Sequence, residues 1–324
     1  MSIDLNPEIS VVIPLFNEEG NVEILFDQLN QTLKTINRSY ELIFVDDGSQ
    51  DRTRDICLKI QCNHPELIIV ALKGNCGQTA ALSAGFDYAK GRIIISMDGD
   101  LQHNPREIPK FLKWIDLGYD VVSGWRENRI DPFFTRKLPS RIANWIMAKW
   151  SGIDLRDFGT TYKAYRREVI KNTTLYGQFH RFIPALIENM NVKIKEISIE
   201  SIQRKSGKSN YNIFRTFTVF FDLIRIRFLT RYLNKPLQIF GSIGFILGSL
   251  GFAIAFYLSY LKFFEGLVIM EVRGPLFLLS ILLMLVGMQF LTIGLLGEIV
   301  VKLYYKLPQT TIYTVEKIFD KTTT

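Results

Sequence analysis

The sequence predicts an α/β domain with a mostly parallel sheet, followed by helices at a membrane surface and two transmembrane helices. Three observations support this prediction. Strand-like and helix-like segments alternate from Ile9 to about Ser201, an aromatic amphipathic segment follows, and two long uncharged runs lie near the C-terminus. The chain has 324 residues, is 48% hydrophobic and has a mean hydropathy of +0.12, which excludes a disordered chain.

Alternating patterns define the first part of the chain. Apolar, β-branched runs typical of strands occupy Ile9–Pro14, Glu41–Val45, Leu67–Ala71, Ile93–Met97 and Asp120–Ser123. Helical periodicity separates them, at Val22–Leu33, Thr53–Ile60, Thr79–Ala89 and Ile108–Leu117. Strands that alternate with helices predict a parallel sheet covered on both faces. Ligands of such sheets bind at the carboxyl ends of the strands, so the chemistry is expected there.

Two uncharged runs are long enough to cross a membrane. Leu237–Tyr260 and Pro275–Gly297 contain no charged residue, and a helix needs about 20 apolar residues to span a bilayer. The alternative is a pair of buried core helices, but these are usually shorter and interrupted by charge. Four glycines in the first run fit close helix packing in lipid, namely Gly241, Gly244, Gly248 and Gly251.

Basic residues predict the orientation of these helices. They flank the pair at Arg225, Arg227, Arg231, Lys235, Lys302 and Lys306. The stretch between the two runs holds only Lys262 and Arg273. The N-terminus also lacks the basic and apolar pattern of a signal peptide. We therefore expect an integral inner or plasma membrane protein with its first domain and both termini in the cytoplasm.

An aromatic face marks the segment before the first run. Within Asn212–Tyr232, apolar residues recur at helical spacing, and Arg215, Asp222 and Arg225 lie off that face. This pattern predicts a helix lying in the membrane interface, and an amphipathic helix packed on the soluble domain is the alternative. Pro132–Trp150 is similar but less regular.

The three cysteines do not form an obvious framework. Cys57, Cys62 and Cys76 are odd in number and pair with no second cluster. This favours buried free thiols in a reducing compartment over disulfides or a metal site.

Acidic and amide residues follow three of the predicted strands. The first strand leads into Pro14–Gly20, the second into Asp46–Ser49 and the fourth into Asp98–Gln102. In a parallel sheet these ends share one crevice. Asp98 and Asp100 could share Mg²⁺ or Mn²⁺, which prefer oxygen ligands and commonly retain substrate phosphates. The alternative is a solvated turn.

Several enzyme classes lack their motifs in this chain. There is no Gly-x-x-x-x-Gly-Lys-Ser/Thr loop and no Gly-x-Gly-x-x-Gly after the first strand, which argues against an ATPase and a dinucleotide oxidoreductase. The chain has three histidines and no Gly-x-Ser-x-Gly elbow, so serine hydrolase chemistry is unsupported.

The order of the motifs resembles a known family. PLFNEEGN, VDDGSQDRT, GNCGQTAALSAGFDYAKG and MDGDLQ follow one another as in GT-A type, family 2 glycosyltransferases. DFGTTYKAYRR, QFHRFIPAL and QRKSGKSNYN resemble polyprenyl-phosphate glycosyltransferases, which include dolichol-phosphate mannose synthases and bacterial undecaprenyl-phosphate glucosyltransferases. The resemblance implies a Rossmann-like GT-A domain over 1–210, an interface helix over 211–235, two transmembrane helices over 236–303 and a cytoplasmic tail over 304–324.

The resemblance also implies roles for individual residues. Those matching the donor site are Pro14, Asn17, Glu18, Asp46, Asp98, Gly99 and Gln102. Asp98 and Asp100 match the metal site, and Asp157 matches an acidic residue near the transfer point. Arg126, Arg141 and Arg204 match positions for the acceptor phosphate, with solvated surface arginines as the alternative. Asp157, Asp100 and Arg204 are the residues expected to carry catalysis, and His180 and Arg181 are either core residues or phosphate contacts.

The implied activity is the inverting, in-line transfer of a sugar from a nucleotide sugar to a polyprenyl phosphate for cell-surface glycan modification. Mg²⁺ or Mn²⁺ would assist the leaving group, and UDP-glucose is the favoured donor, with GDP-mannose, UDP-N-acetylglucosamine or an amino-arabinose donor as alternatives. The implied partners are the nucleotide sugar, the lipid phosphate, the membrane and further copies of the chain, in a homo-oligomer such as a tetramer, but no nucleic acid.

Two other functions are considered. A processive polysaccharide synthase would carry Gln-x-x-Arg-Trp, whereas here Ser206 and Gly207 follow Lys205. A non-catalytic membrane scaffold that binds nucleotide sugar is disfavoured by the Asp98 and Asp100 pair and by the basic acceptor positions.

Overall fold

The structure is a computed structural model that describes residues 7–126, 148–149, 155–171, 192–200, 236–306 and 312–321. It divides into two compact units, one of Met1–Asp222 with Thr311–Thr324 and one of Leu223–Thr310. The interface helix expected at 211–235 lies outside the described residues, as does the 132–150 segment apart from residues 148–149.

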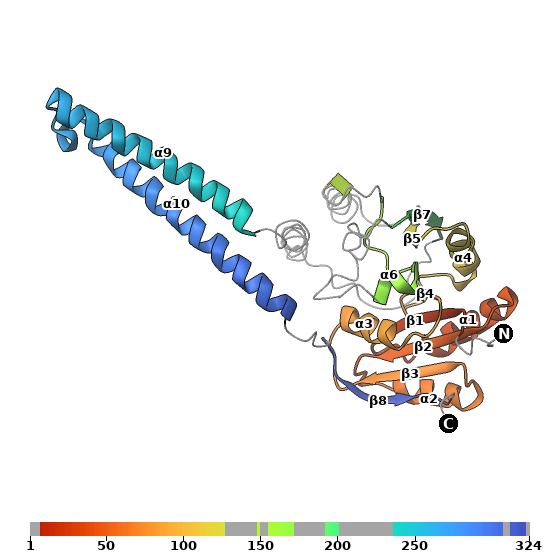
Figure 1. Cartoon of the computed structure of the whole chain (residues 1–324). Helices are drawn as coiled ribbons and strands as arrows, with labels where there is room; N and C mark the ends of the chain where they lie inside the picture. Colours follow the sequence, from red (N-terminus) through yellow and green to blue (C-terminus); the bar gives the residue numbers. More distant parts are fainter. Residues whose placement is uncertain are drawn as a thin grey trace. The chain divides into compact units, whose positions relative to one another are not determined.

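The first unit is built on one mixed sheet (Figure 1). Its strand order within the described residues is β7-β5-β6-β4-β1-β2-β3-β8. The strands are β1 (Ile9–Leu15), β2 (Tyr40–Asp46), β3 (Leu67–Leu72), β4 (Ile93–Ser96), β5 (Val121–Arg126), β6 (Lys163–Arg166), β7 (Ile194–Ile199) and β8 (Val315–Phe319). β1 pairs in parallel with β2 and β4, and β2 with β3. The predicted α/β fold with a parallel central sheet is therefore confirmed.

Antiparallel strands extend this core on both sides. β6 joins β4 to β5, and β8 covers the outer edge of β3. The segment 304–324, expected to be a tail, thus supplies an edge strand of the first unit.

Helices cover both faces of the sheet. They are α1 (Val22–Ile36), α2 (Thr53–Asn63), α3 (Gln78–Tyr88), the short 3₁₀ helix η1 (Pro105–Glu107), α4 (Ile108–Asp116) and α6 (Arg167–Lys171). Residues of α1, α2 and α4 share one core with Val11 and Ile13 of β1, while residues of α3 and α6 share the other with Val12. The alternation along β1 explains this division, because successive strand side chains point to opposite faces.

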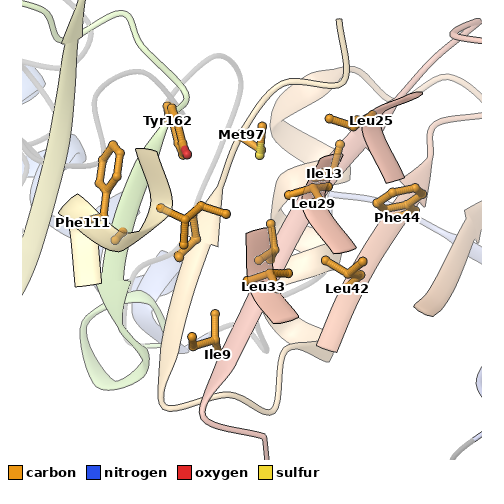
Figure 2. Packing of buried hydrophobic residues seen from close by; sticks show 14 of the residues in the cluster. Ile9, Ile13, Leu25, Leu29, Leu33, Leu42, Phe44, Met97, Phe111 and Tyr162 are labelled. Carbon is orange, nitrogen blue, oxygen red and sulfur yellow. The ribbon is translucent and has the colours of Figure 1, made fainter. Parts of the chain in front are cut away.

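The spacing of leucines places α1 on its face. Leu25, Leu29 and Leu33 recur every four residues and lie over Ile13 and Leu42 (Figure 2). All five side chains are buried. The apolar stripe is what the sequence pattern predicts for a helix packed on a sheet.

The second unit contains two long apolar helices, α9 (Pro236–Glu265) and α10 (Ile269–Lys306). Their mean hydropathies of 2.1 and 2.4 make both long and apolar enough to cross a membrane. α10 bends near its start, where Arg273 leaves the helical conformation and Pro275 follows.

Glycines allow α9 and α10 to approach closely. A Cβ added to Gly244 would lie 2.6 Å from the Gly287 carbonyl oxygen, and one on Gly251 would lie 2.8 Å from that of Ser280. The expected role of glycine in helix packing is confirmed for these two positions. Gly248 differs, because a Cβ there would meet nothing within 4 Å.

All three cysteines are free, as expected, but only Cys57 is buried. Burial raises the pKa of the Cys57 thiol to about 12. Cys62 and Cys76 are exposed, so the expectation of burial is wrong for these two. Cys62 lies near the end of α2 and Cys76 lies just before α3. Neither is among the buried residues of these helices.

We predict that Gly244→Ala lowers the stability of the helix pair, because its methyl group would force the backbones of α9 and α10 apart. Overpacking of this kind costs about 1–3 kcal/mol. Thermal unfolding of the purified protein in detergent, followed by circular dichroism, measures the effect. Gly248→Ala is the matched control and should unfold at or above the wild-type temperature. Equal melting temperatures for the two variants would contradict the packing role of Gly244.

Candidate active site

The loops at the carboxyl ends of β1 and β2 are joined by hydrogen bonds. The Asn17 backbone N–H donates to Ser49 Oγ (3.1 Å), and the Gln50 N–H donates to Asn17 Oδ1 (2.8 Å). The Glu18 N–H donates to Thr53 Oγ1 (2.8 Å). Asn17 has a φ of 55°, a left-handed conformation that asparagine tolerates well. Asn17 and Glu18 are thereby held at the edge of the sheet predicted for ligand binding.

Asp46 lies beneath these loops and is fully buried. Its Oδ1 accepts a hydrogen bond from the Ser49 N–H (3.0 Å), and its Oδ2 accepts one from Arg54 Nε (2.6 Å). Both carboxylate oxygens therefore accept hydrogen bonds from the protein. Asp46 thus stabilises the loop after β2 from its buried side.

Asp47 connects the β2 loop to the start of α3. Its two oxygens accept hydrogen bonds from the backbone N–H groups of Cys76 (2.7 Å) and Gly77 (2.9 Å). Burial raises the pKa of Asp47 above its ordinary value, and these two donors oppose the rise. Gly48 follows with a φ of +71°, and a Cβ there would lie 2.6 Å from the carbonyl carbon of Gly74. The turn therefore requires glycine for conformation and for space.

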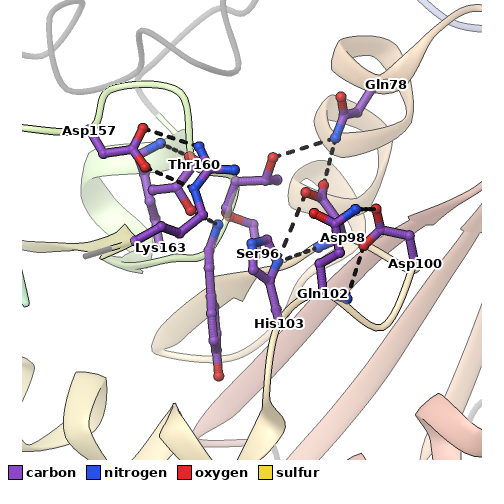
Figure 3. A network of polar contacts seen from close by, with 12 residues as sticks. Gln78, Ser96, Asp98, Asp100, Gln102, His103, Asp157, Thr160 and Lys163 are labelled. Atoms are coloured by element: carbon purple, nitrogen blue, oxygen red, sulfur yellow. Dashed lines mark hydrogen bonds and ion pairs between the residues drawn. The ribbon is translucent and has the colours of Figure 1, made fainter. Parts of the chain in front are cut away.

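The Asp98–Asp100 loop follows β4 at the same edge (Figure 3). Asp98 Oδ1 accepts a hydrogen bond from Gln78 Nε2 (2.6 Å) at the start of α3. Asp100 accepts hydrogen bonds from the backbone N–H (3.2 Å) and Nε2 (2.9 Å) of Gln102. Both carboxylates are thus oriented by amide groups of neighbouring side chains and backbone.

Gly99 lets this loop pack on the end of β1. A Cβ at this position would lie 2.6 Å from Leu15 Cδ2 and 3.3 Å from the Pro14 carbonyl oxygen. Glycine therefore brings the Asp98–Asp100 backbone against the strand that leads to Asn17 and Glu18.

A buried histidine supports the loop from below. His103 Nδ1 accepts a hydrogen bond from the Asp98 N–H (3.2 Å), and its ring lies 5.1 Å from that of Tyr162 between centroids. Burial lowers the pKa of His103 below its ordinary value. Because Nδ1 accepts this hydrogen bond, a neutral imidazole here carries its proton on Nε2.

The donor chemistry of the loop fits a hard divalent cation. Asp98 and Asp100 offer carboxylate oxygens, which Mg²⁺ and Mn²⁺ prefer. Within the described residues, no group of three or more His, Cys, Asp or Glu side chains gathers to form a closed metal site. Two carboxylates alone leave coordination positions that substrate oxygens and water can fill.

Arg126 and Asp157 form a two-bond ion pair. Arg126 Nε lies 2.8 Å from Asp157 Oδ2, and Nη2 lies 3.2 Å from Oδ1. The Gly159 N–H also donates to Asp157 Oδ1 (3.1 Å). The side chains of Arg126 and Asp157 are only 17% and 6% exposed, so the pair is shielded from water. Sequence reasoning placed both residues in the site, but did not predict that they bind each other.

Glu196 of β7 supports the backbone beside this pair. Its Oε1 accepts hydrogen bonds from the N–H groups of Arg156 (2.8 Å) and Asp157 (3.0 Å). Burial raises the pKa of Glu196 above its ordinary value, although these two donors partly offset the effect.

The Asp157 loop is tied to the Asp98 loop by polar contacts. Gln78 Nε2 donates to Thr161 Oγ1 (3.4 Å) as well as to Asp98, and Ser96 Oγ donates to the Thr161 carbonyl (2.6 Å). The fully buried Lys163 donates through Nζ to the carbonyls of Phe158 and Thr160 (Figure 3). The structure thus brings Asp98, Asp100, Arg126 and Asp157 into one polar network.

Some predicted residues lie outside the described ranges, namely Arg141, His180, Arg181 and Arg204. Sequence reasoning missed four residues that hold the described site together, Arg54, Gln78, His103 and Lys163. Gln78 could have been found, because it follows Gly77 at the start of a predicted helix within a quoted motif. Arg54, His103 and Lys163 contact groups only three to eight positions away in the sequence. Their residue types alone do not indicate these contacts, which depend on how the loops fold.

The sequence matches one family model and several known proteins. The family described as Glycosyl transferase family 2 matches residues 10–174. The chain is 39% identical over 317 residues to the dodecaprenyl-phosphate galacturonate synthase of Rhizobium johnstonii, covering 97% of this chain and 93% of that protein. It is 34% identical over 320 residues to the undecaprenyl-phosphate 4-deoxy-4-formamido-L-arabinose transferase of Photorhabdus laumondii, covering 98% and 96%.

Solved structures share the fold at low sequence identity. Glucosyl-3-phosphoglycerate synthase from Mycobacterium tuberculosis, in complex with Mn²⁺, UDP and glucosyl-3-phosphoglycerate, matches with a TM-score of 0.53 and 18% identity. The match covers 69% of this chain and 80% of that chain. It confirms the fold predicted for the first unit.

We predict that Asp157→Asn destabilises the protein, because it leaves the shielded guanidinium of Arg126 without its counter-charge. The melting temperature should fall by about 6 to 20 °C, which corresponds to about 3–5 kcal/mol. Asp116→Asn is the matched control, because Asp116 makes a similar two-bond pair with Arg38 on the surface. The side chains of Arg38 and Asp116 are 27% and 41% exposed. Loss of this pair should lower the free energy of unfolding by at most about 1 kcal/mol. Equal shifts in both variants would contradict a special role for the buried pair.

Proposed function

We infer that the chain, which belongs to glycosyl transferase family 2, transfers a sugar from a nucleotide donor to a polyprenyl phosphate. The main support is the match along nearly the whole chain to two enzymes whose names specify polyprenyl-phosphate acceptors. That match includes α9 and α10, the helices apolar enough to cross a membrane. Such an anchor suits a lipid acceptor, because it keeps the enzyme at the membrane where that acceptor lies.

We propose that the loops after β1, β2 and β4 bind the nucleotide sugar. Pro14, Asn17 and Glu18 would contact the nucleoside, with Asp46 fixing their loop from below. Gly99 and Gln102 would place the Asp98–Asp100 loop against the diphosphate. Hydrogen bonds already connect these loops without a donor, which supports a site that is formed before the donor binds.

Asp98 and Asp100 are the proposed ligands of Mg²⁺ or Mn²⁺. When bound, the cation would stabilise the negative charge that develops on the leaving nucleoside diphosphate. Gln78 and Gln102 hold the two carboxylates in place, so they would keep the ligands oriented before the cation arrives.

The acceptor phosphate needs little help to become a nucleophile. The second pKa of a phosphate monoester is about 6, so the group is largely ionised at neutral pH. Asp157 accepts three hydrogen bonds from Arg126 and Gly159. We therefore propose that Asp157 orients Arg126 and removes no proton. Arg126, together with Arg141 and Arg204, would hold the acceptor phosphate, because guanidinium groups bind phosphate through paired hydrogen bonds.

The identity of the sugar is a separate proposal. The sequence favoured UDP-glucose, whereas the two relatives are named for galacturonate and 4-deoxy-4-formamido-L-arabinose. We propose galacturonate as the first sugar to test, because its relative has the higher identity, 39% against 34%. Glucose and the amino-arabinose derivative follow as alternatives.

The membrane arrangement is also proposed. The chain leaves the first unit before α9 and returns to it after α10. If both helices span the membrane, the two flanks must lie on one side, and the basic flanking residues favour the cytoplasm. We further propose, from the resemblance alone, that the protein forms a homo-oligomer.

We predict that Asp100→Asn lowers transfer by about 10² to 10³-fold, because the cation loses an anionic ligand at the developing charge. The readout is sugar-lipid formation by the purified protein in detergent with undecaprenyl phosphate and Mn²⁺, followed by mass spectrometry. Chelation with EDTA should abolish wild-type transfer, and Mn²⁺ or Mg²⁺ should restore it. Asp116→Asn should transfer normally. Normal turnover by Asp100→Asn, or transfer in EDTA, would contradict the metal site.

We predict that one nucleotide sugar supports transfer far better than the others. UDP-galacturonate, UDP-4-deoxy-4-formamido-L-arabinose, UDP-glucose, UDP-N-acetylglucosamine and GDP-mannose are offered separately with undecaprenyl phosphate. Product from UDP-galacturonate alone supports the proposed sugar, and product from UDP-glucose would restore the expectation from the sequence. Nucleotide binding without a lipid product from any donor would favour the scaffold function over the enzyme.

A further inference from the structure

The last strand of the chain begins beside the donor loops. β8 pairs antiparallel with β3, with Val315 opposite Leu72. The backbone N–H of Lys73 also donates to the Thr314 carbonyl (2.9 Å). Since Leu72 is the last residue of β3, the first residues of β8 lie at the carboxyl edge of the sheet, where the site is built.

Glu316 of this strand reaches Asp46 through one arginine. Arg54 Nη1 lies 2.9 Å from Glu316 Oε2, and Arg54 Nε lies 2.6 Å from Asp46 Oδ2. Because the guanidinium group is planar and rigid, two carboxylates on different nitrogens fix its orientation. Glu316, together with the Leu72 carbonyl that accepts from Arg54 Nη2 (3.5 Å), therefore helps to orient Arg54 toward the buried Asp46.

The contacts continue from Asp46 to the proposed donor-binding residues. Asp46 Oδ1 accepts a hydrogen bond from the Ser49 N–H (3.0 Å), and Ser49 Oγ accepts one from the Asn17 N–H (3.1 Å). A continuous series of polar contacts thus runs from Glu316 through Arg54, Asp46 and Ser49 to Asn17.

We propose that Glu316 and Arg54 are positioning residues for the donor nucleotide, supplied in part by the chain beyond α9 and α10. This inference rests on the proposed function. It implies that the donor loops gain their full support only after both apolar helices have been synthesised and the chain has returned to the sheet. The donor site would then be completed only in a chain that already carries its membrane anchor.

The other end of β8 provides a matched control. Asp320 Oδ2 lies 3.3 Å from Lys90 Nζ, just after Phe319, which pairs with Ile69 nearer the start of β3. Asp320→Asn therefore removes an ion pair between the same C-terminal segment and the same unit. The contacts from Glu316 to Asn17 stay in place in this variant. It therefore shows the effect of weaker attachment of the C-terminal segment without loss of the proposed positioning of the donor loops.

The test compares Glu316→Gln and Asp320→Asn in the purified full chain. We expect Glu316→Gln to raise the KM for the nucleotide sugar about two- to five-fold at low ionic strength, with the KM for undecaprenyl phosphate unchanged. The expected change is modest because the side chains of Arg54 and Glu316 are 29% and 50% exposed. It should shrink as salt screens the pair. Asp320→Asn should keep the wild-type KM for the donor.

A second variant tests whether Glu316 acts through Arg54. In an Arg54→Gln background, Glu316→Gln should have no additional effect on the donor KM, since the two residues act in series. Full additivity of the two changes would overturn the inference. It would also be overturned by equal donor KM values for Glu316→Gln and Asp320→Asn, or by equal effects of Glu316→Gln on donor and acceptor KM.

Nucleotide binding separates this inference from the proposed function. If the wild type transfers no sugar from any donor, the proposed function fails. UDP and GDP titrations by calorimetry then still compare the variants. Weaker nucleotide binding by Glu316→Gln than by Asp320→Asn supports the positioning role. Equal affinities, or no nucleotide binding by the wild type, overturn it.

Discussion

The site depends on the pairing of each acidic side chain at the sheet edge with a hydrogen-bond donor. A parallel sheet brings the ends of β1, β2 and β4 together, and this chain places aspartates on the loops after β2 and β4. Without compensation, these like charges would repel one another and any phosphate. The structure pairs Asp46 with Arg54, Asp98 with Gln78, and Asp157 with Arg126. These hydrogen bonds hold the loops in place, but only Asp46 and Asp157 are paired with a cationic side chain in them.

The central elements could be predicted from sequence because their side chains follow simple periods. β1 alternates between two cores, and α1 repeats leucine every four residues. β6, β7 and β8 were missed because charged residues interrupt their apolar patterns and their places depend on distant partners. β8 has largely exposed residues, and it owes its place to pairing with β3 rather than to an apolar pattern of its own.

The positions of the site loops were predictable, but several roles within them were not. The acidic residues after buried strands were expected to share one edge of the sheet, and the structure places the loops after β1, β2 and β4 at that edge. The sequence could not show that Asp46 is fully buried and bound to Arg54, because the partner approaches from α2. Nor could it show that Asp157 binds Arg126, since 31 positions separate them and the contact depends on the antiparallel β5–β6 edge. The type of a residue and its place after a strand predict where it lies. The role of that residue depends on its contacts with other helices and strands.

Charge balance explains why this site requires more than its own carboxylates and one arginine. The proposed reaction brings together two anions, a nucleotide diphosphate and a lipid phosphate. In the described part of the site, Asp98 and Asp100 add negative charge, and Arg126 already neutralises Asp157. A divalent cation would balance the diphosphate. The sequence offers further basic residues for these anions, among them Arg141 and Arg204, which are proposed above to hold the acceptor phosphate. The formal net charge of +7 is therefore consistent with a protein that must attract two phosphate-bearing substrates to one sheet edge at a membrane surface.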